Sequence, residues 1–113
     1  MVARNKLLAA PPYPVEQALK RLGENLRIAR IRRNMTIDDV AARIGTGPRA
    51  VMDVEKGKPS TGIVVYSALL WLFGLLTPFD ELADPARDKE GLARESTRAR
   101  ARVRKSGALD NEF

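Results

Sequence analysis

The stretch from Thr36 to Gly57 reads T-I-D-D-V-A-A-R-I-G-T-G-P-R-A-V-M-D-V-E-K-G, and its punctuation predicts two short helices joined by a tight turn. Thr36 can cap the first helix through its hydroxyl, and Asp39 three residues later can complete a capping box. Gly45 supplies the backbone freedom that a sharp turn needs, and Pro48 suits the first position of a second helix. Gly57 then ends that helix. Single residues therefore set the boundaries of both helices.

Apolar residues recur at helical spacing along the same stretch. They are Ile37, Val40, Ala41 and Ile44 in the first helix and Val51 and Val54 in the second. Both helices are therefore expected to pack through a shared apolar face, and Ala41 is small enough to let them cross closely. This spacing is that of a helix-turn-helix.

The order I-G-x-x-x-x-x-V-x-x-V-E-x-G resembles the helix-turn-helix of Xre and lambdoid phage repressors, from Leu22 to Leu76. The resemblance implies an all-α, five-helix lambda-repressor-like domain. It also implies an ion pair between Arg30, on the preceding helix, and Glu55, which closes the recognition helix. The alternative for this pair is an ordinary surface contact, which contributes less than about 1 kcal/mol.

The positions of prolines, glycines and charged residues along the chain predict three segments. Residues 1–14, with three prolines, form a stiff N-terminal arm, residues 15–84 form the domain, and residues 85–113 form an Arg-rich tail. The helices outside the central motif are expected over 15–33, 62–73 and 77–82. On the first of them, one apolar stripe is formed by Ala18, Leu19, Leu22, Leu26 and Ala29.

Composition excludes several classes of site. With 113 residues and 44% hydrophobic content, the chain can supply one core without metals or disulfides. It has no Cys and no His, which excludes Cys/His zinc sites and Cys–His or Ser–His catalysis. The carboxylate pairs Asp38-Asp39 and Asp80-Glu81 suit helix starts, where acids favour the dipole. We therefore expect no enzyme, no metal and no cofactor.

The longest apolar run, from Ile63 to Leu76, is shorter than the ~20 residues that a membrane span requires. The N-terminus lacks the pattern of a secretory signal. These two features predict a cytoplasmic protein without a membrane partner, and binding to DNA would make it nucleoid-associated.

Positive charge is unevenly distributed along the chain, whose net charge is +6. Residues 1–33 carry eight Lys/Arg and two acids, residues 34–84 carry four and seven, and residues 85–113 carry eight and five. Because the motif region is net negative, attraction to phosphate must come from the first helix, the Lys56/Lys58 corner and the C-terminal arginines.

The resemblance implies base-reading positions at Pro48, Arg49, Met52 and Asp53. Arg49 is the strong reader, since arginine bonds guanine O6 and N7 together, whereas Met52 offers apolar contact to a thymine methyl. Asp53 can accept from cytosine, or it can hold Arg49 or Lys56 in place. The phosphate-contact candidates are Thr36, Lys56, Lys58, Ser60 and Arg33. The alternative is a solvated helix face on a protein-binding module.

The helix expected over 62–73 is apolar almost all round, which is more than one core face hides. Members of the family form dimers through their last helices, as a palindromic operator requires. The candidates for a two-fold interface are Trp71, Leu75, Leu76, Phe79 and Leu82. The alternative is plain intradomain core, which is favoured for Leu69, Leu72 and Leu76.

The tail is the second informative feature. Arg98, Arg100, Arg102 and Arg104 alternate as in a strand, while the alanines between them favour helix. Crowding of like charges predicts disorder until a partner binds. The arginines suit DNA phosphates or an acidic protein surface, and Leu109 and Phe113 suit anchors in a partner's groove.

An Xre-type domain followed by an Arg-rich arm and a terminal Leu/Phe peptide resembles the HipB-type antitoxins. This second resemblance implies a homodimer that binds its own operator DNA, represses its operon and neutralises a HipA-type kinase toxin. Two alternatives remain open: a free-standing Xre or phage-type repressor, and a protein-interaction module that retains the fold.

Overall fold

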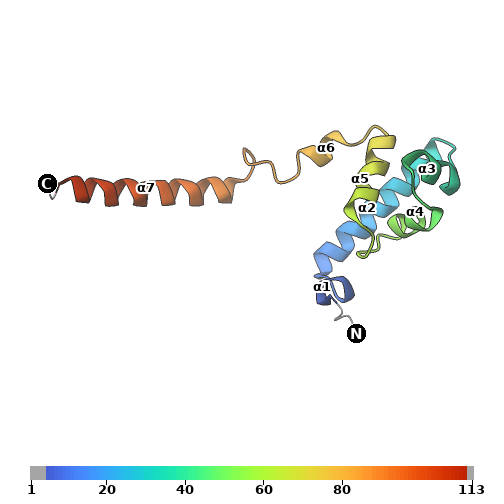
Figure 1. Ribbon diagram of the computed structural model, residues 1–113, viewed down its shortest axis with the longest axis horizontal. Coiled ribbons are helices and arrows are strands. Elements are labelled where there is room, and N and C mark those ends of the chain that lie inside the picture. The colour runs from blue at the N-terminus through green and yellow to red at the C-terminus, as the bar shows by residue number, and fades with distance from the viewer. Residues whose placement is uncertain (1–4, 112–113) are drawn as a thin grey trace. The chain divides into compact units, whose positions relative to one another are not determined.

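The computed structural model describes the backbone of residues 5–111 and the side chains of residues 5–105. That part of the protein is all-helical and contains no strand. The chain divides into two compact units, with the boundary between Phe79 and Asp80. Its helices are α1 (Lys6–Ala9), α2 (Tyr13–Arg32), α3 (Ile37–Ile44), α4 (Pro48–Glu55), α5 (Ile63–Leu72), α6 (Thr77–Asp80) and α7 (Lys89–Asn111) (Figure 1).

One hydrophobic core holds the first unit together. α4 packs on both α2 and α3, and α5 packs on both α3 and α4 (Figure 1). The most completely buried side chains are Leu26, Val40, Val51, Val54 and Leu69. Since each of the four helices contributes at least one of them, their stability comes from this packing more than from helix propensity.

The caps and the turn of the central motif confirm the sequence prediction. Thr36 and Asp39 form both bonds of the capping box at the start of α3. Gly45 ends α3 in the left-handed conformation with φ 79°, and Pro48 opens α4. Gly57, at φ 70°, ends the turn after α4. The apolar positions predicted in both helices are buried or half-buried, and Ala41 is 1% exposed.

α2 differs from the prediction in where it begins and in which residues it buries. It begins at Tyr13 rather than Val15, because a proline at the second helical position lacks only an N–H that would have no partner there. Leu26 and Ala29 are buried as predicted, but Ala18 is exposed. Gly23, which was not part of the predicted apolar stripe, is buried against α4. A Cβ on Gly23 would overlap the backbone oxygen of Val54, so only glycine permits this approach.

α5 is apolar on all sides, and the fold buries only part of it. Tyr66 and Leu69 lie in the core, as does Phe73 just after the helix. Leu72 is half-buried and packs against the core. Ile63, Val64 and Trp71 are 69%, 70% and 61% exposed. No helix within residues 5–111 combines the length and the hydropathy that crossing a membrane requires.

Three predictions about the ends of the chain were wrong. The arm contains the one-turn helix α1, whose Asn5 cap accepts from the Leu7 N–H. The helix expected to reach Leu82 ends at Asp80, and the five helices predicted for the domain correspond to α2 to α6. The tail forms the 23-residue helix α7 rather than a disordered arm. Its alanines and arginines are strong helix formers, and this preference outweighs the like-charge crowding.

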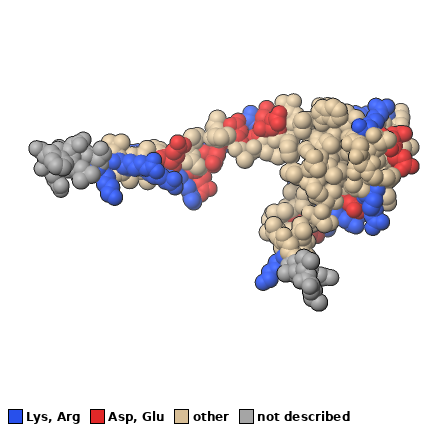
Figure 2. All heavy atoms as spheres, in the orientation of Figure 1, with Lys and Arg blue, Asp and Glu red and all other residues tan. Residues whose placement is uncertain are grey.

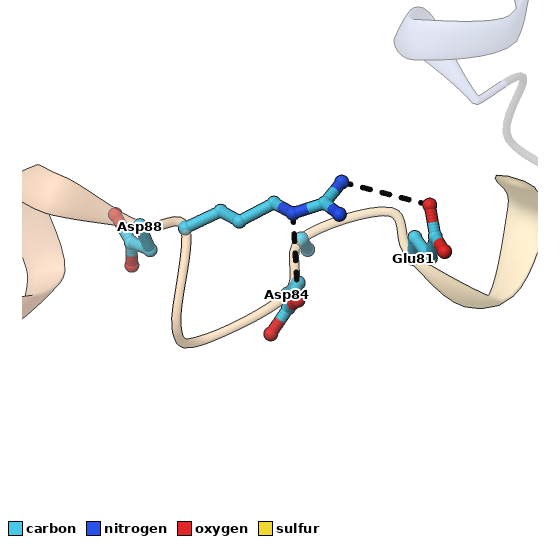
Figure 3. Close-up of a pocket in the computed structure, with 5 residues that line it drawn as sticks. Glu81, Asp84 and Asp88 are labelled. Carbon is cyan, nitrogen blue, oxygen red and sulfur yellow. Dashed lines mark ion pairs between the residues drawn. The ribbon is translucent and has the colours of Figure 1, made fainter.

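The second unit begins with a turn that is held by one arginine. Arg87 lies 3.5 Å from the Glu81 carboxylate and 3.8 Å from that of Asp84, and dashed lines in Figure 3 mark the two ion pairs. Asp88 then accepts a hydrogen bond from the Gly91 N–H at 2.9 Å, which caps the first turn of α7. These contacts are local, and they explain where α7 starts.

Candidate nucleic-acid interface

Arg30 and Glu55 join the C-terminal end of α2 to that of α4. Arg30 Nε lies 2.6 Å and Nη2 3.0 Å from the two Glu55 oxygens, which makes a two-bonded ion pair. Their side chains are 13% and 9% exposed. Nη1 also donates to the Met35 carbonyl at 2.9 Å, at the entry to α3. The pair expected from the resemblance is therefore present and largely buried, and it fixes α4 relative to the rest of the unit.

The Glu55 hydrogen bond also affects the pKa of Arg30. It raises the pKa of the Arg30 guanidinium above its ordinary value, although partial burial acts in the opposite direction. The hydrogen-bonded carboxylate thus outweighs the loss of solvent. Arg30 therefore remains charged near neutral pH.

α4 buries one face and presents the other to solvent. Val51 and Val54 are fully buried, whereas Pro48, Arg49 and Met52 are exposed. The Arg49 side chain is 81% exposed. Three of the four residues predicted to read bases therefore lie on the outward face of α4, whereas Asp53 is half-buried.

Asp53 is half-buried beside this face, and two cations lie near its carboxylate. Its Oδ1 lies 3.6 Å from Arg49 Nε and 3.2 Å from Lys58 Nζ. The sequence suggested Lys56 as a second partner, but Lys58 holds that position. Oδ1 is buried and lacks a hydrogen bond within the described residues, so both contacts are ion pairs without hydrogen-bond geometry.

The Asp53 charge also reaches the phenol of Tyr66. Desolvation is the main cause that raises the pKa of Tyr66, and the Asp53 carboxylate adds to it. The Tyr66 hydroxyl donates to the Lys58 carbonyl at 3.0 Å, which ties α5 to the loop after α4. This neutral phenol and the Asp53–Lys58 pair together hold the loop in place.

Four of the five phosphate-contact candidates lie around α3 and α4. Thr36, Lys56 and Ser60 are exposed, and Lys58 is half-buried beside Asp53. Arg33, the fifth candidate, already has partners within the protein. Its Nη1 and Nη2 donate to the carbonyls of Ala29 and Phe73 at 2.8 and 3.0 Å, and the guanidinium lies 5.2 Å from the centre of the Phe73 ring. It therefore joins the ends of α2 and α5.

Packing brings a third lysine to the same corner. A groove between α1, the start of α2 and the loop after α4 is lined by Lys20, Lys56 and Lys58, among others. Lys20 is there because Gly57 packs directly on its backbone, where a Cβ would lie 2.6 Å from the Lys20 Cα. No motif in the sequence marked Lys20, since this contact joins residues far apart in the chain.

The predicted interface and tail residues divide between the two units. Trp71 and Leu75 are exposed, and Leu76 and Phe79 are half-buried. Leu82 is 68% exposed and belongs to the second unit. The four predicted arginines of the tail, Arg98, Arg100, Arg102 and Arg104, are all exposed on α7. Phe113 and the side chain of Leu109 lie outside the part that the structure describes.

Within the described residues, no cluster of three or more acidic side chains is arranged to hold a metal ion. A scan against protein-family models and searches of curated proteins and of solved structures found no match.

Proposed function

We propose that this protein is a sequence-specific repressor of the Xre type, which binds operator DNA as a homodimer and places α4 in the major groove. In this proposal α3, the turn and α4 form the helix-turn-helix. The observation that carries it is the division of α4 into a buried Val51/Val54 face and an exposed face headed by Arg49. A rigidly held helix with an exposed guanidinium in its first turn suits guanine recognition in the major groove.

Exposed side chains that could contact phosphate near α4 support this placement. Thr36 and Ser60 offer hydroxyls, and Lys56 offers an exposed ammonium group. Such contacts set the register of a helix on the duplex without reading sequence. The ion pair between Arg30 and Glu55 keeps α4 in a fixed position, so that the reading residue and the phosphate contacts form one rigid surface.

Asp53 restricts what α4 can bind. It opposes phosphate, and it already partners Arg49 and Lys58 at 3.6 and 3.2 Å. Arg49 must therefore leave the Asp53 carboxylate in order to bind DNA. Two hydrogen bonds to guanine compensate for the loss of this ion pair better than a single phosphate contact does. This exchange favours sequence selectivity over general affinity for DNA.

The exposed apolar side chains of α5 and the turn that follows it support a second copy as partner. Val64, Trp71 and Leu75 are 70%, 61% and 43% exposed. Side chains of this size are usually covered when they gather on one helix. A two-fold axis through this surface would present two copies of α4 to the two half-sites of a palindromic operator.

Neutralisation of a HipA-type kinase toxin and a nucleoid-associated location stay predictions from the resemblance. Leu109 and Phe113, which were expected to anchor the toxin, have no described side-chain contacts. A free-standing repressor needs the same Arg49 surface and no toxin. A protein-interaction module needs neither Arg49 nor operator DNA, so a DNA-binding experiment distinguishes it from both.

The test is selection of bound fragments from a random duplex library by the purified full chain at physiological salt. We expect one enriched sequence that contains guanine at the position read by Arg49. Arg49→Ala should weaken binding to that sequence roughly 5- to 150-fold, corresponding to about 1–3 kcal/mol for a bidentate contact. Binding to unselected duplex should change little.

Arg49→Lys is the matched control, because it retains the charge and loses the bidentate geometry. We expect it to behave as Arg49→Ala on the selected sequence. If no sequence is enriched, or if Arg49→Lys binds the selected sequence as tightly as the wild type, the proposed role of α4 is wrong.

A further inference from the structure

α7 carries its cations on one side of the helix. At about 100° per residue, the six cations between Arg94 and Lys105 fall within an arc of about 200°. The other side holds Leu92, Glu95, Ser96, Ala99 and Val103. The two sides of α7 are not obvious from the sequence, because the arginines at 98, 100, 102 and 104 alternate as they would in a strand.

Small residues run along the middle of the cationic arc. Ala93, Thr97 and Ala101 follow one another at intervals of four, and with Glu90, Arg94 and Arg98 they line a shallow hollow along the helix. Arg100 and Arg104 lie on the opposite flank of this line. The backbone of α7 can therefore approach a partner closely, while long cationic side chains reach past it on both flanks.

These cations are largely without internal partners. Within residues 5–105, only Arg94 of the six has an ion pair, with Glu90. Arg100 Nη2 lies 3.3 Å from the hydroxyl of Ser96. Every side chain described from Leu92 to Lys105 is exposed, and Figure 2 shows Lys and Arg atoms along α7. Like charges at i,i+4, such as Arg94 with Arg98, destabilise the free helix. A polyanion would relieve this repulsion.

The size of α7 and the placement of its cations indicate which kind of polyanion it fits. Residues 89–105 span roughly 25 Å, and a helix with its side chains is about 10–12 Å wide. The major groove of DNA is about 12 Å wide and has a phosphate wall on each side. Cations on both flanks of one helix match two walls, whereas an acidic protein surface offers one. A membrane surface would need a broad apolar face, and Leu92 and Val103 are the only large apolar side chains of residues 89–105.

We propose that α7 is a second DNA-binding element, which lies in the major groove and contacts the phosphates on both walls independently of base sequence. The proposal rests on the proposed function, because the duplex that α7 holds is the one that α4 reads. α7 supplies the affinity that the net negative region around α4 lacks, and it anchors the protein while α4 selects its site.

The test uses the full chain and a short duplex of random sequence, with binding measured at several KCl concentrations. One variant, Arg98→Gln with Arg102→Gln, removes two cations from one flank. Loss of two phosphate contacts lowers the slope of log affinity against log salt by about 1.8. Raising KCl from about 50 to about 200 mM should therefore weaken the wild type roughly tenfold more than this variant.

A variant with two exchanged positions separates the helix surface from simple polycation behaviour. Arg98→Ala with Ala99→Arg, and Arg102→Val with Val103→Arg, preserves composition and net charge but moves two cations to the opposite face. We expect it to lose as much affinity and salt slope as the double Gln variant. Ala99→Gln with Val103→Gln, which alters only the opposite face, should bind as the wild type does. Circular dichroism of each variant checks that α7 remains helical.

Wild-type binding by the exchanged variant would overturn the proposal, because it would show that the charges act without the helix. So would equally tight binding to polyglutamate at the same charge concentration, which would make an acidic polypeptide an equal partner. The two proposals fail separately. If α7-dependent binding to random duplex occurs without any enriched sequence, the role of α4 is wrong and that of α7 stands. If enrichment depends on Arg49 but the α7 variants bind random duplex normally, the role of α7 is wrong.

Discussion

α2 and α7 are the two long helices of this protein, with 20 and 23 residues, and different forces hold them. α2 buries Gly23, Leu26 and Ala29 against its neighbours. α7 buries none of its side chains up to Lys105, and its described contacts are its own hydrogen bonds and local ion pairs. Both helices are rich in arginine, so composition does not separate them. One is a structural member of a core, and the other is a free charged surface.

One ion pair from each helix shows how burial changes the contribution of an ion pair to stability. Arg30–Glu55 and Arg94–Glu90 both have a closest N–O distance of 2.6 Å. The first pair is 13% and 9% exposed, whereas the second is 76% and 74% exposed. Water screens the second pair and competes for its hydrogen bonds. Equal geometry therefore corresponds to unequal energy, and burial decides the difference.

Glycine substitutions should give the largest contrast between the helices. Gly23→Ala places a methyl group against the backbone of α4, 2.9 Å from both the Glu55 oxygen and the Gly57 nitrogen, and backbone cannot rotate away. We expect a loss of about 3 kcal/mol in the free energy of unfolding. Gly91→Ala meets only the Asp88 carboxylate, which can turn aside, so the change should be below about 1 kcal/mol. Chemical denaturation followed by circular dichroism measures both, and equal effects would mean that α2 and α4 are not in close contact.

Removing one carboxylate from each ion pair should give the next largest contrast. Glu55→Gln leaves the Arg30 guanidinium charged and largely buried without its partner, and we expect a loss of about 3 kcal/mol. Glu90→Gln leaves Arg94 in water and should cost less than about 0.5 kcal/mol. Denaturant midpoints at neutral pH measure both variants. A small cost for Glu55→Gln would show that solvent reaches the α2–α4 link.

The smallest effect is expected at the capping box of Thr36 and Asp39 at the start of α3. Its hydrogen bonds are local, like those of α7, but they lie in the first unit. Hydrogen bonds from the backbone and hydroxyl of Thr36 lower the pKa of Asp39 below its ordinary value. The stability that this carboxylate contributes is therefore present above pH about 3.9 and is lost as the pH falls through the lower pKa of the folded state. Asp39→Asn should destabilise α3 at neutral pH, and its difference from the wild type should vanish in acid.

Asp38→Asn is the control for this pH dependence, because it removes the same charge from the same helical turn without breaking the box. Urea unfolding of the three proteins at neutral and acidic pH measures the effect. A difference between Asp39→Asn and the wild type that persists in acid, or an equal response of Asp38→Asn, would contradict the role of the box.

Local chemistry explains where the sequence predictions succeeded. Thr36, Asp39, Gly45 and Pro48 act on backbone groups within four residues, so their effects can be read along the chain. The same local preferences favoured α7, and the prediction of disorder was wrong because it weighted charge repulsion above helix propensity. The contact between Arg33 and Phe73 could not be predicted for a different reason, since the two residues are 40 positions apart.

The sequence by itself determined α3, α4, their caps and the turn between them, because these depend on contacts within a few residues. It also determined the uneven charge, which identifies two candidate surfaces for DNA. Only the tertiary structure decided which apolar residues of α5 are buried, that Gly23 must be glycine, and that Asp53 partners Lys58. Each of these depends on atoms brought together across helices, where steric fit and the exclusion of water are properties of the packing and of no single segment.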